Sequence, residues 1–156
     1  MPNHFHMMMR QLQENGVSIF LQRLQMSHSK YFNKVYKRVG VLFGGRFKAV
    51  HIGDDEQFTH VSRYIHLNPL ELFDPQWKGR GYVVDKEEAM KFLKAYTWSS
   101  MPDYLGNITQ FSSLIDKKPI MEYFDNNPAQ YLTFLQDWIA SEQSSDSFMD
   151  FDLITG

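Results

Sequence analysis

The sequence of 156 residues contains no cysteine. Disulfide bonds, cysteine nucleophiles and zinc sites built from thiolates are therefore excluded, and the composition fits a reducing compartment. The sequence also lacks an apolar run long enough to cross a bilayer, and its first residues do not show the basic and apolar regions of a secretory signal. These absences predict a protein of the cytoplasm that does not act on a membrane.

Acidic residues are scarce in the first third of the chain. Residues 1–50 contain eight basic residues and one acidic residue, Glu14, whereas residues 51–156 contain 8 basic and 17 acidic residues. The eight basic residues are Arg10, Arg23, Lys30, Lys34, Lys37, Arg38, Arg46 and Lys48. This asymmetry predicts an anionic partner, most simply a nucleic acid. The competing interpretation is an unevenly charged surface without any partner.

Hydrophobic residues make up 43% of the chain and aromatic residues 15%, which is enough for a packed core. The length fits one domain with a small C-terminal appendage. Alternating patterns predict two strands, at 4–10 and 46–52. Helical spacing predicts helices at 18–37, 54–67, 85–96, 108–115, 119–125 and 128–141. Residues 70–84 carry Pro75 and Gly79-Arg80-Gly81 and are predicted to be irregular.

The helix predicted at 18–37 has an apolar face and a basic face, with Ser18 as its N-cap. The basic face holds Arg23, Lys30, Lys34, Lys37 and Arg38. It is either an ordinary solvated surface or a surface that follows a phosphate backbone. Gly44-Gly45-Arg46 forms a basic turn just after it, which either contacts phosphate or only reverses the chain.

Two histidines, His4 and His6, flank Phe5 near the start of the sequence. Side chains alternate between the two faces of a strand, so both imidazoles point the same way while Phe5 points to the core. Two imidazoles on one face can share a metal ion. A structural role for such a pair is the more common alternative.

The helix predicted at 54–67 begins with the acidic residues Asp54-Asp55-Glu56 and ends before Asn68-Pro69. Tyr64 and Asn68 are four residues apart and so share one side, with His60 one turn earlier. A tyrosine hydroxyl beside a metal-polarised phosphate can act as a nucleophile on a phosphodiester. An amide oxygen from Asn68 suits Mg²⁺ or Mn²⁺. Most helical tyrosines, however, serve in cores or interfaces.

Four sequence blocks carry a family resemblance when they are taken together. They are Met1-Pro2-Asn3-His4-Phe5-His6, Leu42-Phe43-Gly44-Gly45-Arg46-Phe47-Lys48-Ala49, Arg63-Tyr64-Ile65-His66-Leu67-Asn68-Pro69 and Tyr96-Thr97-Trp98-Ser99-Ser100. In this order and spacing, they resemble the REP-associated tyrosine transposases, a branch of the single-tyrosine HUH transposases. The resemblance covers about residues 1–105.

The resemblance implies roles for individual residues. His4 and His6 match the metal-binding histidines, and Asn68 matches a polar residue that helps to hold Mg²⁺ or Mn²⁺. Tyr64 matches the nucleophile that takes the 5′ phosphate of cleaved single-stranded DNA. Arg46 and Lys48 are implied DNA contacts. The implied activity is the nicking and strand transfer of hairpins in single-stranded DNA, in a protein associated with the bacterial nucleoid.

In the family, a strand, a helix and a further strand precede the His-x-His strand. The sequence shows no such elements before His4, so the resemblance implies an N-terminally truncated member. We expect an α+β fold that lacks the family's first strand and helix, keeps a remnant of the ferredoxin-like antiparallel sheet and is mostly helical in its C-terminal half. The expected organisation is a partial HUH domain at 1–105, a helical C-terminal extension at 106–141 and a flexible acidic tail at 142–156. Two strands leave unpaired edges, and a homodimer would pair them across two copies.

Two other functions stay open at this point. One is a transposase remnant that binds nucleic acid without cleaving it, because the sheet that holds the histidines is incomplete. The other is a helical interaction module that binds protein through the acidic part of the chain. Two-histidine oxygenase chemistry would need a nearby carboxylate, which Asp54 and Asp55 supply only if the fold bends them back.

Overall fold

The computed structural model describes residues 4–140, and these form two compact units. Residues 8–50 make up one unit, and residues 4–7 together with 51–140 make up the other. We call them the 8–50 unit and the main unit. Residues 1–3 and the predicted acidic tail lie outside the described residues.

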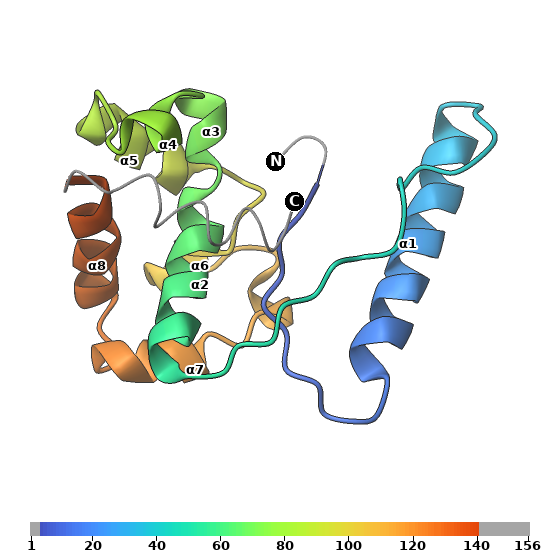
Figure 1. Ribbon diagram of the computed structural model, residues 1–156, viewed down its shortest axis with the longest axis horizontal. Helices are drawn as coiled ribbons and strands as arrows, with labels where there is room; N and C mark the ends of the chain where they lie inside the picture. Colours follow the sequence, from blue (N-terminus) through green and yellow to red (C-terminus); the bar gives the residue numbers. More distant parts are fainter. Residues whose placement is uncertain (1–3, 141–156) are drawn as a thin grey trace. The chain divides into compact units, whose positions relative to one another are not determined.

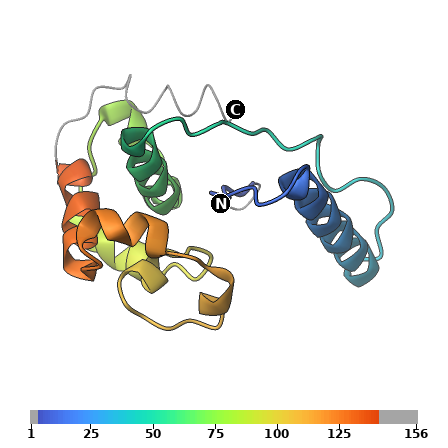
Figure 2. The ribbon, with the colours of Figure 1, turned by 90° about the horizontal axis from the view of Figure 1, so that it is seen from below.

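The 8–50 unit contains one long helix, α1 (Gly16–Val35), drawn in blue in Figures 1 and 2. It begins two residues earlier than predicted, because Asn15 adopts a left-handed conformation (φ 57°) that turns the chain into the helix. The predicted cap Ser18 therefore lies inside the first turn. At the other end, Lys37 is also left-handed (φ 50°) and ends the helix before Gly40.

The main unit is built from short helices around two longer ones, α2 (Asp55–Leu67) and α8 (Pro128–Ala140). Near the C-terminal end of α2 lie α3 (Leu70–Phe73), α4 (Trp77–Arg80) and α5 (Lys86–Ala95), as Figure 1 shows. Then come α6 (Met101–Tyr104), the 3₁₀ turn Ser112–Leu114, α7 (Lys118–Met121) and the 3₁₀ turn Glu122–Phe124. The predicted helix at 108–115 is thus only a 3₁₀ turn, and the stretch predicted as irregular contains α3 and α4.

The predicted α+β fold is wrong for the residues that the structure describes. Between residues 4 and 140 there is no strand, and the segments 4–12 and 47–53 run as irregular chain. Alternation alone does not make a strand, because a strand needs a neighbour to pair its backbone N–H and C=O groups. Neither segment has a ladder of hydrogen bonds here, so the remnant antiparallel sheet is not formed.

The core of the main unit combines apolar packing with a buried polar network. Leu70, Trp77, Met101 and Leu135 are among its fully buried side chains. None of the helices between residues 4 and 140 combines the length and the hydropathy that a bilayer crossing requires.

The polar network joins α2 to α8 and to the chain before α6. The Tyr131 hydroxyl lies 2.6 Å from the Ser62 hydroxyl and 2.6 Å from His66 Nδ1. His66 Nε2 lies 2.8 Å from Ser100 Oγ on the other side of the ring. Every polar atom of the His66 ring is thereby satisfied while the ring stays neutral. Burial also raises the pKa of Tyr131, so its hydroxyl stays protonated.

Stability should fall as the pH is lowered from 7 to 5. Burial lowers the pKa of His66 from 6.5 to about 3, against a smaller opposing effect of Asp103. Between these values the unfolded chain binds one more proton than the folded chain, so acid favours unfolding. This one group should cost about 2 kcal/mol between pH 7 and pH 5, measured by urea denaturation. Protonation of His66 in the folded chain near pH 6.5, seen by NMR, would contradict this account.

Replacing Tyr131 by Phe should destabilise the main unit. The variant keeps the buried ring but leaves Ser62 and His66 Nδ1 without their shared partner, which costs about 1–3 kcal/mol. The matched control is Tyr36→Phe in the 8–50 unit, where the tyrosine is exposed, and there the change should stay within about 0.5 kcal/mol. Equal midpoints for both variants in urea denaturation would show that the network does not stabilise the fold.

Candidate active site

Helix α2 begins with reciprocal capping contacts that fix its register. The Asp54 carboxylate accepts a hydrogen bond from the Gln57 N–H at 2.7 Å, and the Gln57 side chain accepts one from the Gly53 N–H at 2.7 Å. This arrangement resembles a capping box, except that the Gln57 side chain bonds the N–H of Gly53, one residue before the N-cap Asp54. The acidic residues Asp55 and Glu56 occupy the first turn, where the helix dipole favours them.

With this register, α2 has two distinct sides. Ser62 and His66 lie on the side that packs against α8, as the network shows. Tyr64 and Asn68 are offset from them by about half a turn and so lie on another side. The sequence correctly placed Tyr64 and Asn68 one turn apart on a helix, because that relation depends only on local spacing.

His4 and His6 lie beside Tyr64, although some 60 residues of sequence separate them. The ring centroids of His4 and His6 are 4.9 Å apart, and those of His6 and Tyr64 are 5.3 Å apart, with the latter rings nearly perpendicular. His4 is exposed, while His6 and Tyr64 are half-buried. The structure therefore brings both predicted metal-binding histidines and the predicted nucleophile into one cluster.

Asn68 joins this cluster through a lysine that sequence reasoning missed. Asn68 is buried (3% exposed), and its Oδ1 accepts a hydrogen bond from Lys78 Nζ at 3.2 Å. The same ammonium lies 5.1 Å from the Tyr64 ring centroid and forms an ion pair with Glu71. No periodic pattern marked Lys78, because it comes from the short helix α4 in a stretch predicted to be irregular.

His4 and His6 offer two donors for a divalent metal ion, and a third comes only from Asn68. Between residues 4 and 140, no group of three or more His, Cys, Asp or Glu residues is arranged to hold an ion. The Asn68 amide oxygen is a donor that suits Mg²⁺ or Mn²⁺, and the two imidazoles are donors to divalent transition-metal ions, of which Mn²⁺ is one. That oxygen already faces a cation, the Lys78 ammonium. The chemistry of these residues therefore fits such an ion.

His60 does not belong to this cluster, in spite of its spacing from Tyr64. Its ring packs edge-on against Trp138 of α8, and its Nδ1 lies 2.9 Å from a guanidinium nitrogen of Arg63. The Arg63 guanidinium carbon lies 3.5 Å from the Trp138 ring centroid. Burial lowers the pKa of His60, and it lowers the pKa of Arg63 to about 10. These residues attach α2 to α8 by cation–π and edge contacts.

The predicted nucleic-acid contacts all belong to the 8–50 unit and are exposed. They are Arg23, Lys30, Lys34, Lys37, Arg38, Arg46 and Lys48. Arg23, Lys30 and Lys34 are seven and four residues apart, so they lie in one line along α1. Along the helix axis, Lys30 lies about 10 Å beyond Arg23, and Lys34 about 6 Å beyond Lys30. Exposed aromatic side chains, including Phe20 and Tyr31, lie on the same helix. The unit thus presents cations and aromatic rings together.

Comparison with known proteins gives one family. The family model described as "Transposase IS200 like" matches residues 1–68, which contain His4, His6, Tyr64 and Asn68. This part of the chain is therefore similar to IS200-like transposases, which supports a transposase-type function. No curated protein and no solved structure gives a significant match.

Proposed function

We propose that this chain binds hairpins in single-stranded DNA and nicks and rejoins them through Tyr64, as a REP-associated tyrosine transposase would. The contact of His6 with Tyr64 carries this proposal, because it places a His-x-His pair against the tyrosine. The family match to residues 1–68 gives independent support. A homodimer and association with the nucleoid belong to the same proposal.

The proposed chemistry conserves the energy of the phosphodiester bond. The Tyr64 hydroxyl oxygen attacks phosphorus and loses its proton, while the bond from phosphorus to the 3′ oxygen breaks and that oxygen takes up a proton. The product is a 5′-phosphotyrosine and a free 3′ hydroxyl, and the reverse reaction joins a new strand. A Mg²⁺ or Mn²⁺ ion held by His4, His6 and Asn68 would supply Lewis-acid polarisation of the phosphate.

The second candidate is a protein that binds nucleic acid without cleaving it. Two observations favour this alternative. In the described part of the chain no strand holds His4 and His6 rigid, and the Asn68 oxygen is engaged by Lys78. The basic line on α1 would act in the same way in either case, so only cleavage separates the two functions.

Incubation of the full chain with a labelled pool of single-stranded hairpins and Mn²⁺ should yield a covalent protein–DNA adduct. Tyr64→Phe should abolish the adduct, because phenylalanine has no nucleophilic oxygen. The matched control is Tyr82→Phe, since Tyr82 is exposed in the same unit and should leave the yield unchanged. Binding of the pool without any adduct from the unaltered chain would select the non-catalytic alternative.

Replacing Arg23, Lys30 and Lys34 together by Gln should weaken hairpin binding and make it less dependent on salt. Each lost contact with a single-stranded phosphate lowers the slope of log K against log salt by about 0.7, so three contacts give about 2. Gln keeps the helix propensity of α1. Binding is measured in the Tyr64→Phe chain to prevent turnover.

The matched control for this experiment is Gln at Lys91, Lys94 and Lys118, three exposed lysines of the main unit. It removes the same charge from the chain but should leave the slope almost unchanged. Equal effects of the two triple variants would mean that only net charge matters and that α1 is not the binding surface.

A further inference from the structure

Lys78 lies outside the residues that match the transposase family, yet it reaches the centre of the candidate active site. Its helix, α4 (Trp77–Arg80), is held in place by Trp77, which is 2% exposed. Arg80, at the end of the helix, forms an ion pair with Asp74. Because these two contacts anchor α4, the backbone that carries Lys78 is held in position.

The Lys78 ammonium is surrounded by groups that compensate its charge. Its side chain is 14% exposed, and it pairs with Glu71 and with the amide oxygen of Asn68. It also lies 5.1 Å from the Tyr64 ring centroid. An ammonium so little exposed needs such partners, and a phosphate oxygen is a partner of the same kind.

We infer that Lys78 is a phosphate-binding catalytic residue of this site. When DNA enters, its ammonium contacts a non-bridging oxygen of the phosphodiester that Tyr64 attacks. An ammonium has three N–H donors, so it can keep Glu71 while the phosphate replaces Asn68. The same exchange leaves Asn68 Oδ1 available as a metal ligand. The inference rests on the proposed function and adds a residue to it.

Removal of the Lys78 charge should weaken DNA binding and slow the chemical step. During attack, negative charge is spread over the phosphoryl oxygens, and one fixed cation stabilises it. Lys78→Gln should therefore slow adduct formation by about 100-fold, as loss of a comparable electrostatic group does. It should also lower the salt slope of hairpin binding by about 0.7, one phosphate contact. Lys78→Arg keeps the charge and should keep the slope.

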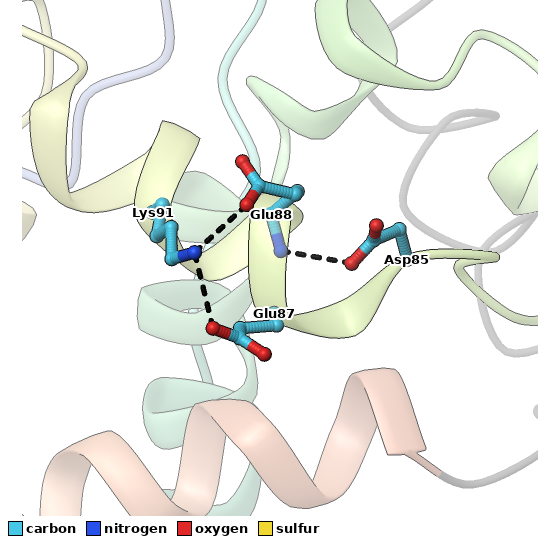
Figure 3. Close-up of polar contacts among 4 residues, drawn as sticks. All are labelled: Asp85, Glu87, Glu88 and Lys91. Atoms are coloured by element: carbon cyan, nitrogen blue, oxygen red, sulfur yellow. Dashed lines mark hydrogen bonds and ion pairs between the residues drawn. The ribbon is translucent and has the colours of Figure 1, made fainter.

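Figure 3 shows a matched control lysine in the same unit. Lys91 on α5 pairs with Glu87 at 3.0 Å and with Glu88 at 2.8 Å, at the helix start capped by Asp85. It resembles Lys78 in charge and glutamate pairing but is 59% exposed. Lys91→Gln should leave both the adduct rate and the salt slope unchanged.

A purely structural role for Lys78 makes a different prediction, tested with Glu71→Gln. That variant removes the carboxylate charge but keeps a side-chain oxygen that can accept a hydrogen bond from the ammonium, so we expect an adduct rate within about threefold of the unaltered chain. Equal damage from Glu71→Gln and Lys78→Gln would overturn the inference. A Lys78→Gln chain with an unchanged salt slope and an unchanged adduct rate would also overturn the inference, while the proposed function would stand. If the unaltered chain forms no adduct, the proposed function fails and this inference fails with it.

Discussion

The arrangement of the main unit depends on the burial of one neutral imidazole, His66, between α2, α8 and the chain at Ser100. Its two nitrogens have hydroxyl partners on opposite sides, which makes the ring a fixed connector between these segments. Ser62 and the Arg63–Trp138 contact add to the attachment of α2 to α8. Because one side of α2 packs against α8, Tyr64 is held on another side, which His6 and Lys78 can reach.

The candidate site is assembled from three parts of the chain with different structural support. Tyr64 and Asn68 lie at the end of a capped helix whose other side is buried. Lys78 comes from a short helix anchored by Trp77. His4 and His6 lie on an irregular segment, without a strand to hold them between residues 4 and 12. Tyr64 is therefore more firmly placed than the histidine pair.

Sequence reasoning succeeded where the relevant physics is local. The acidic start of α2, its end before Pro69 and the shared side of Tyr64 and Asn68 all follow from spacing and capping. It failed on the strands, because strand formation depends on pairing with distant segments. It placed His60 beside Tyr64, but packing against Trp138 draws that ring towards α8. Lys78 was missed because its neighbours in space, Tyr64 and Asn68, are 14 and 10 residues away in sequence.

The division of the chain has a consequence for how such a protein can diversify. The chain leaves the main unit after residue 7 and returns at residue 51, so two connections join the 8–50 unit to it. Under the proposed function, changes at the exposed basic residues of the 8–50 unit can alter which nucleic acid is bound, while the residues that surround His66 and hold Tyr64 stay the same. In that proposal, recognition and cleavage depend on different residues and can change separately.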